Sequence, residues 1–263
     1  MTVPKSGSVD EKRVDELLRD IFSSGEVADA AGQKYKLHSG ISREAGERIA
    51  SVIRERGYSR TLEIGCAYGL SSLYISKGLS QATHPSHTII DAFQSGDWHG
   101  VGLANLARAG VTIHHLIEKP SEIALPQMVA DGCEFDFIFI DGWHTFDHTL
   151  VDFFYSNRLL RVGGVVAIDD FWLAPVNRAV RYAAKYPHYR VLRAAEASPP
   201  ALRRRVLDLT ARIVRTVVPQ GMRREVFNDT FLHSNAMLGL DMPVIFLEKT
   251  AIDARPWDWY SSF

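Results

Sequence analysis

Hydrophobic and polar positions follow one pattern before residue 60 and another after it. Near the N-terminus, apolar residues recur at helical spacing over residues 11–23, and Ser42 begins a second helix that ends before Gly57. Residues 25–40 are expected to be a loop. After residue 60, short apolar strands alternate with helices. The strands are expected at 61–64, 88–91, 111–116, 135–140 and 165–168, with two late strands at 189–192 and 244–247. The helices between them are expected at 70–78, 103–109, 149–160 and 176–185.

Strands that alternate with helices favour right-handed βαβ crossovers and a parallel sheet with helices on both faces. Residues 135–140 are almost wholly apolar, as expected of a strand buried on both faces. We therefore expect an α/β fold with a Rossmann-like, doubly wound, mostly parallel seven-stranded sheet and an antiparallel edge. Residues 1–58 are expected to form an N-terminal helical segment and residues 59–263 the main domain, with a helical insertion at about 196–235.

Composition excludes several classes of protein. The 263 residues include 30 Lys and Arg against 31 Asp and Glu, so the basic excess of a nucleic-acid-binding protein is absent. No run of about 20 apolar residues predicts a membrane-spanning helix. The polar start lacks the apolar stretch of an export signal. Two cysteines, Cys66 and Cys133, are too few for a disulfide framework, so a cytoplasmic protein is expected.

Acidic residues and glycines follow four of the predicted strands. They are Glu63 and Gly65 at the first strand, Asp91 at the second, Asp141 at the fourth, and Asp169 and Asp170 at the fifth. In open parallel sheets, ligands bind outside the carboxyl ends of the strands. Because an isolated buried carboxylate is costly, this many acids at one edge favour a binding site.

The turn after the first strand indicates the kind of ligand. Gly65 and Gly69 allow a ligand to approach the backbone closely. Ala67 stands where a dinucleotide-binding turn has its second glycine, which disfavours a pyrophosphate and hence NAD. Glu63 suits a cationic group, and Asp91 is placed to accept hydrogen bonds from ribose hydroxyls. Together these residues favour a nucleoside that carries an ammonium or sulfonium group.

Four segments resemble motifs of a known family. Residues 62–72 resemble the first motif of class I S-adenosylmethionine-dependent methyltransferases, in particular the O-methyltransferases related to the catechol and caffeoyl-coenzyme A enzymes. Residues 135–141 and 160–170 match the fourth and fifth strand motifs of that family. Residues 141–147 resemble the D-G-x-H-x-Y/F-D pattern of a bacterial branch that includes tailoring methyltransferases. The resemblance covers roughly residues 35–190.

This resemblance implies an S-adenosyl-L-methionine-dependent enzyme that methylates a small-molecule hydroxyl. The cofactor-binding residues that it implies are Glu63, Gly65, Tyr68, Gly69, Ser71, Asp91, Phe93, Pro120, Ser121 and Asp141. It also implies a divalent cation, expected to be Mg²⁺, on Asp141, Asp169 and Asp170. In the family, that cation gathers the acceptor hydroxyl and lowers its pKa. Oxygen-rich ligand sets of this kind suit Mg²⁺.

Two departures from the catechol-type pattern leave alternatives open. His144 replaces the lysine of that branch, and Asp170 replaces its more usual asparagine. Asp141 and His144 are the catalytic candidates, and His144 is suited to act as general base without a metal. His144 with His148 at helical spacing is a weaker candidate for a zinc pair.

Other features remain open as well. Trp98, Trp143 and Trp172 follow strand ends and are candidate aromatic walls around an acceptor. A basic amphipathic helix is expected within residues 201–225, and with it the chain could be a non-catalytic binding module. We expect a homodimer, with the N-terminal helix and the insertion as contact surfaces. The identity of the methyl acceptor is not predicted.

Overall fold

The computed structural model describes residues 8–192, 235–238, 240 and 242–261 of the chain. The insertion expected at about 196–235, apart from Asn235, and the basic helix expected within residues 201–225 therefore lie outside the described residues. None of the described helices has the length and apolar composition needed to cross a membrane.

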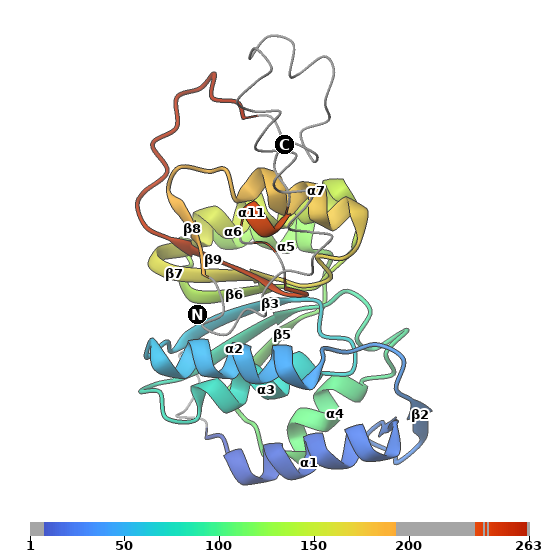
Figure 1. The fold of residues 1–263 in the computed structure, drawn as a ribbon. Helices are drawn as coiled ribbons and strands as arrows, with labels where there is room; N and C mark the ends of the chain where they lie inside the picture. The colour runs from blue at the N-terminus through green and yellow to red at the C-terminus, as the bar shows by residue number, and fades with distance from the viewer. Residues whose placement is uncertain (1–7, 193–234, 239, 241, 262–263) are drawn as a thin grey trace.

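A seven-stranded sheet runs through the middle of the molecule (Figure 1). Its strands lie in the order β5 (His114–Ile117), β4 (Ser86–Ile90), β3 (Arg60–Ile64), β6 (Phe135–Ile140), β7 (Leu160–Ile168), β9 (Ile245–Lys249) and β8 (Tyr189–Val191). Strands β5, β4, β3, β6 and β7 are parallel, and β9 is antiparallel to both β7 and β8. This order confirms the expected doubly wound sheet with an antiparallel edge.

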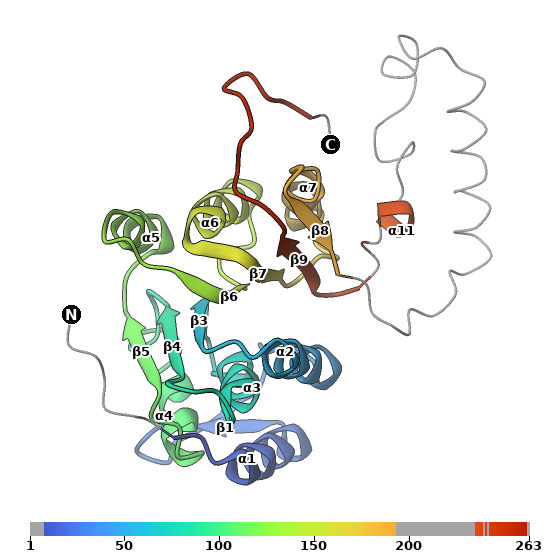
Figure 2. The same ribbon diagram turned by 90° about the vertical axis from the view of Figure 1, so that its left-hand side faces the viewer.

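Helices cover both faces of the sheet (Figures 1 and 2). On one face lie α2 (Arg43–Glu55), α3 (Leu70–Leu79) and α4 (Val101–Arg108), with α1 (Glu11–Ser24) outside them. On the other lie α5 (Ser121–Ala130), α6 (Phe146–Leu159) and α7 (Ala174–Ala183), and the short α11 spans Asn235–Leu238. Because side chains alternate along β6, Phe137 and Phe139 enter one core while Ile138 and Ile140 enter the other.

Three local predictions are wrong. Residues 25–40 contain a hairpin of β1 (Glu26–Ala28) and β2 (Lys34–Lys36), because the Asp29 carboxylate closes a turn by accepting backbone N–H groups of Ala31 and Gln33. Helix α5 was not expected, and it forms with Pro126 inside it. Strand β5 begins later than expected because the N–H of Val111 still bonds to Leu106 in the turn that ends α4.

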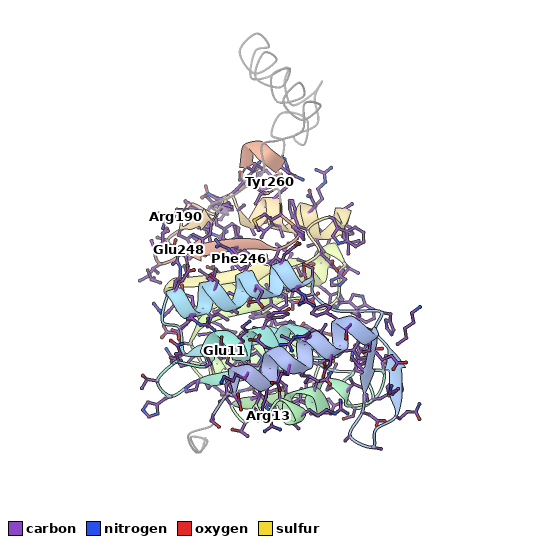
Figure 3. The ribbon with its side chains drawn as sticks, turned by 60° about the horizontal axis from the view of Figure 1, so that its bottom comes forward. Glu11, Arg13, Arg190, Phe246, Glu248 and Tyr260 are labelled. Atoms are coloured by element: carbon purple, nitrogen blue, oxygen red, sulfur yellow. The ribbon has the colours of Figure 1, made fainter. Side chains whose placement is uncertain are left out.

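Ion pairs join the N-terminal helices to the rest of the fold. Arg54 of α2 contacts Glu11 of α1 at 2.7 Å. Arg56, just after α2, lies 2.8 Å from Glu248 of β9, which also contacts Arg190 of β8 at 2.6 Å. Figure 3 shows Arg190 and Glu248 next to each other at this edge. Arg56 thereby ties the end of α2 to the antiparallel strands β8 and β9.

Candidate active site

A cavity of about 500 Å³ opens at the carboxyl edge of the parallel strands. Residues that directly follow three neighbouring strands line it. They are Gly65 and Ala67 after β3, Asp91, Ala92 and Phe93 after β4, and Asp141, Gly142, Trp143 and His144 after β6. The start of α5 adds Lys119, Pro120, Ser121 and Glu122, and Ser39, Asp97, Trp98 and His148 complete the wall together with Ile64 and Ile90. Of the residues predicted at the strand ends, Gly65, Asp91 and Asp141 line this cavity, whereas Glu63 does not.

The turn after β3 is fixed by its own backbone. Gly65 has φ +87°, and a Cβ at this position would collide with the carbonyl oxygen of Asp141. Oδ2 of Asp91 accepts the N–H groups of Cys66 at 3.0 Å and Ala67 at 2.9 Å. Ala67 itself has φ +47°, a conformation that glycine adopts more easily. Asp91 thus holds the turn and at the same time faces the cavity.

Glu63 lies beneath this turn and does not line the cavity. Its side chain is fully buried, and Oε2 accepts the hydroxyl of Ser72 and lies 3.0 Å from Nε2 of His87. Oε1 has no hydrogen-bond partner among the described residues. A buried carboxylate with an unused oxygen is able to accept one more donor. The role of Glu63 toward the cofactor stays a prediction.

Three other predicted cofactor residues also lie behind the wall of the cavity. The hydroxyl of Tyr68 meets Nε2 of His38 at 2.7 Å. Gly69 is the N-cap of α3, and a Cβ there would lie 2.9 Å from the backbone of Gly102. Ser71 is buried in the first turn of α3. Their contact with a cofactor stays a prediction.

Aromatic side chains frame part of the cavity. The rings of Phe93 and Trp143 are 6.0 Å apart, and the rings of Trp143 and His148 are 6.2 Å apart. Trp98 packs edge-on against Tyr68 at 5.1 Å. Trp98 and Trp143 therefore do line the cavity. Trp172 does not, and its exposed indole donates a hydrogen bond of 2.8 Å to Oδ1 of Asp170.

A second feature at the cavity is a group of possible metal ligands. One ligand atom each from Asp141, His144 and Asp170 lies within 4.8 Å of the others. Nε2 of His144 is 3.0 Å from Oδ2 of Asp170 and 3.8 Å from Oδ1 of Asp141. Asp169 lies next to this group, where its Oδ1 accepts the N–H of Asp170 at 2.8 Å. The group of possible metal ligands therefore consists of Asp141, Asp170 and His144, and Asp169 is not part of it.

Burial and like charges shift the pKa values in this group. Burial, followed by the charges of Asp169 and Asp170, raises the pKa of Asp141 well above its usual range. Burial raises the pKa of Asp169 to about 6. The hydrogen bond between His144 and Asp170 lowers the pKa of Asp170 and raises the pKa of His144. Such repulsion among carboxylates is relieved by a proton or by a cation.

One functional candidate was not anticipated from the sequence. Asp152 of α6 is 1% exposed, and its Oδ1 has no hydrogen-bond partner among the described residues. Burial raises the pKa of this carboxyl to about 6. The available signal was an acid on the helix face that also carries Thr149 and Phe153, both of them buried. An acid at such a position has to be explained, since carboxylates rarely lie inside without a reason.

Comparisons with known proteins agree with this geometry. Residues 62–171 match a family model described as a methyltransferase domain. A protein of Arabidopsis thaliana, named as a caffeoyl-CoA O-methyltransferase, is 29% identical over 150 residues. The aligned region covers 55% of this chain and 61% of that protein, less than two thirds of the relative's length.

Two solved structures share the fold. The O-methyltransferase from Bacillus cereus, in complex with SAH, has a TM-score of 0.53 and 20% identity over 73% of this chain and 85% of its own. TomG from Streptomyces achromogenes, an O-methyltransferase of tomaymycin synthesis in complex with SAM, has a TM-score of 0.55 and 20% identity over 70% of this chain and 83% of its own.

The match to the family model runs from β3 to the residues that follow β7. It therefore contains the turn at Gly65, the acid that follows β4 and the acidic group at the cavity. The TM-scores show that the two solved structures share the overall fold of this chain. Residues 62–171 thus match a methyltransferase domain, and the chain is similar to proteins named as O-methyltransferases.

Proposed function

We propose that this protein transfers the methyl group of S-adenosyl-L-methionine to a hydroxyl oxygen of a small molecule. The proposal is carried by the cavity at the carboxyl edge, where Gly65, Asp91 and Asp141 come together from three adjacent strands inside a methyltransferase domain. Its volume of about 500 Å³ lies in the usual range of small-molecule sites, roughly 300–1,000 Å³.

The residues of the cavity fit a cationic nucleoside. Oδ1 of Asp91 accepts one backbone N–H, from Phe93, and so retains capacity for a ribose hydroxyl. Phe93 and Pro120 offer apolar surface for a flat base. Asp141 places negative charge in the same cavity, which attracts a sulfonium or ammonium group. In this proposal Asp91 binds the sugar of the cofactor, and Asp141 lies at its charged end.

The group of Asp141, His144 and Asp170 fits a divalent cation. Its ligand atoms already lie close together, and the repulsion that raises the pKa of Asp141 is what a cation would remove. Asp169 adds a further carboxylate beside it. When bound, such a cation lowers the pKa of an acceptor hydroxyl and makes its oxygen nucleophilic. We propose Asp141, Asp170 and His144 as its ligands, with Asp169 either as a further ligand or as a neighbouring charge.

The transfer itself is a displacement at the methyl carbon. The acceptor oxygen forms a bond to this carbon, the bond from carbon to sulfur breaks, and its electron pair stays on the sulfur of S-adenosylhomocysteine. The hydroxyl proton goes to a base. Holding oxygen, carbon and sulfur in line supplies much of the rate enhancement. Trp143, which lines the cavity next to Asp141, is suited to orient an acceptor.

The contact between His144 and Asp170 favours a second candidate mechanism. Oδ2 of Asp170 lies 3.0 Å from the imidazole and fixes its orientation, as an acid does for a catalytic histidine. In this mechanism neutral His144 takes the hydroxyl proton, and no metal is needed. Because Asp170 raises the pKa of His144, the neutral base forms at higher pH than for an isolated histidine.

Release of S-adenosylhomocysteine tests both mechanisms. The purified chain is incubated with S-adenosylmethionine and a panel of phenols, catechols and sugar alcohols, with and without an excess of chelator. Loss of turnover in chelator supports the metal-assisted mechanism. Turnover that survives chelator but is lost in His144→Ala supports the metal-free one. Absence of both product formation and cofactor binding would contradict the proposed function.

A further inference from the structure

The group of possible metal ligands at the cavity contains one imidazole and two carboxylates. Ligand atoms of Asp141, His144 and Asp170 lie within 4.8 Å of one another. Asp141 and His144 line the cavity in the segment that follows β6, and Asp170 comes two residues after the end of β7. A cation at this point would therefore meet one nitrogen and two oxygen donors.

The spacing of these atoms fits a small divalent cation. Nε2 of His144 is 3.0 Å from Oδ2 of Asp170 and 3.8 Å from Oδ1 of Asp141. Ligands that lie about 2.0–2.2 Å from one metal ion, at tetrahedral or octahedral angles, are roughly 3–3.5 Å apart. Zn²⁺ and Mg²⁺ have nearly the same bond lengths, so the spacing does not choose between them. The choice depends on the kind of donor atom.

The backbone after β7 brings the imidazole, and not a third carboxylate, to these two acids. Oδ1 of Asp169 accepts the N–H of Asp170 at 2.8 Å. Asp170 has φ +52°, and its carboxyl is directed to His144. The indole N–H of Trp172 donates to Oδ1 of Asp170, which leaves Oδ2 for the contact with the imidazole. Such outer hydrogen bonds orient metal ligands.

The other histidine of the cavity has a different partner. His148 lines the cavity, and its Nδ1 lies 2.9 Å from the hydroxyl oxygen of Thr145. Among the described residues it is not part of the group that could hold a metal. The two histidines therefore differ in surroundings, although they lie one helical turn apart in the sequence. His148 offers a matched control for His144.

An imidazole ligand changes which cations a site prefers. Mg²⁺ takes oxygen ligands and keeps several of its waters. Imidazole nitrogen suits Fe²⁺, Ni²⁺ and Zn²⁺, which bind such ligands more strongly along the series. An imidazole in place of a carboxylate also removes one negative charge, on which the affinity for Mg²⁺ depends. A site with two carboxylates and one imidazole therefore favours the later first-row metals.

We infer that His144 is a metal ligand through Nε2 and makes this site select a first-row transition metal, in the series from Fe²⁺ to Zn²⁺, over Mg²⁺. This inference rests on the proposed function in its metal-assisted form, and it names a different cation from the Mg²⁺ that the sequence predicts. In the metal-free mechanism the imidazole would keep its nitrogen for the hydroxyl proton. The two roles of His144 therefore exclude each other.

The test is calorimetric titration of the full chain with CoCl₂ and with MgCl₂. Co²⁺ lies within the series, and its unpaired electrons shift the proton signals of a coordinated imidazole out of the ordinary NMR range. Wild-type protein is expected to bind one Co²⁺ per chain, more tightly than Mg²⁺, and to show the shifted signals of one imidazole.

Two variants assign the ligand. His144→Glu replaces the nitrogen by an oxygen donor of similar reach. The ratio of the Co²⁺ affinity to the Mg²⁺ affinity should fall by about tenfold or more, a loss that even removal of an outer-shell partner produces, and the shifted signals should disappear. His148→Gln removes the other cavity histidine and should keep both the ratio and the signals. Circular dichroism melts establish that each variant is folded.

The outcomes separate this inference from the proposed function. If His144→Glu keeps the wild-type ratio or the shifted signals, His144 is not a ligand and the inference is wrong. It is equally wrong if wild-type protein binds Mg²⁺ as tightly as Co²⁺, or binds neither ion. In each of these cases the proposed function stands as long as wild-type protein binds S-adenosylhomocysteine in the same calorimeter. Absence of that binding would contradict the proposed function, whatever the ratio of the two metals.

Discussion

The imidazole Nε2 of His144 lies 3.0 Å from Oδ2 of Asp170. This pairing lowers the pKa of Asp170 and raises the pKa of His144. The contribution of His144 to stability is therefore complete below its unfolded pKa of about 6.5 and is lost as the pH rises through its higher folded pKa. The contribution of Asp170 is present above about pH 3.9 and is lost as the pH falls through its lower folded pKa.

Asp170→Asn is expected to lower the pKa of His144, because the variant replaces a carboxylate by a neutral amide. The change is followed by NMR titration of the imidazole in metal-free protein. The variant should also lose stability at about pH 5–6, where both partners are charged, and much less at pH 9. Asp147→Asn, which removes the acid 3.7 Å from His148, is the matched control and should leave His144 unchanged. An unaltered titration of His144 in Asp170→Asn would show that the pair is not formed in solution.

Metal binding can be followed through Trp172, whose indole donates to Oδ1 of Asp170. Mn²⁺ is expected to quench the emission of this indole, and Mg²⁺ in excess should reverse the effect. Trp172→Phe should remove most of the signal, while Asp141→Asn should weaken Mn²⁺ binding by about tenfold or more, since one ligand loses its charge. Equal quenching in wild type and Asp141→Asn would place the ion elsewhere.

Asp152→Asn is expected to stabilise the protein in a pH-dependent way. The folded pKa of about 6 exceeds the unfolded value of about 3.9, so folding is favoured when this carboxyl is protonated and that advantage is lost as the pH rises through 6. A difference of about two pKa units corresponds to roughly 3 kcal/mol. Urea unfolding should show a gain approaching this size at pH 8 and little change at pH 4.

The control for this gain is Asp131→Asn, because Asp131 is exposed. Its free energy of unfolding should change little at either pH. A loss of stability in Asp152→Asn that is the same at pH 4 and pH 8 would contradict a pKa raised by burial.

Gly65→Ala should be far more harmful than Gly57→Ala. Both glycines have positive φ, so both substitutions strain the backbone by about 1–2 kcal/mol. A Cβ at Gly57 meets nothing within 4 Å, whereas one at Gly65 collides with the backbone of Asp141. Thermal unfolding should show a small decrease for Gly57→Ala and a larger one for Gly65→Ala, with ligand binding lost only in the second. Similar behaviour of the two variants would contradict the close approach of the β3 turn and the end of β6.

Strand ends could be predicted from the sequence because their signals are local. The apolar run of β6 and the glycine after β3 determine where Asp141 and Gly65 lie, and both line the cavity. The direction of a side chain, in contrast, depends on contacts with residues that are distant in the sequence. Glu63 lies within β3, two residues before Gly65, and its side chain points to Ser72 and His87 in the interior.

The side-chain directions of Asp169 and Asp170 could not be predicted from the sequence either. Asp169 and Asp170 are adjacent in sequence, but the positive φ of Asp170 directs its carboxyl to His144 while Asp169 bonds to the backbone. A spacing pattern does not contain this change of direction, so the sequence predicted Asp169 in the group and left His144 as a separate base. Asp152 was missed because its face of α6 is buried only when α5 is present. Helix α5 itself was not predicted, since it has a proline inside it. The homodimer, the cytoplasmic location and the division at residue 58 stay predictions.

Binding of S-adenosylhomocysteine tests the central claim most directly. Isothermal titration of the full chain should show one site per chain, and Asp91→Asn should weaken the affinity by about tenfold, since a carboxylate that accepts a ribose hydroxyl becomes an amide. Asp131→Asn should bind as wild type does. No heat and no thermal shift with wild-type protein at millimolar ligand would contradict a cofactor site in this cavity.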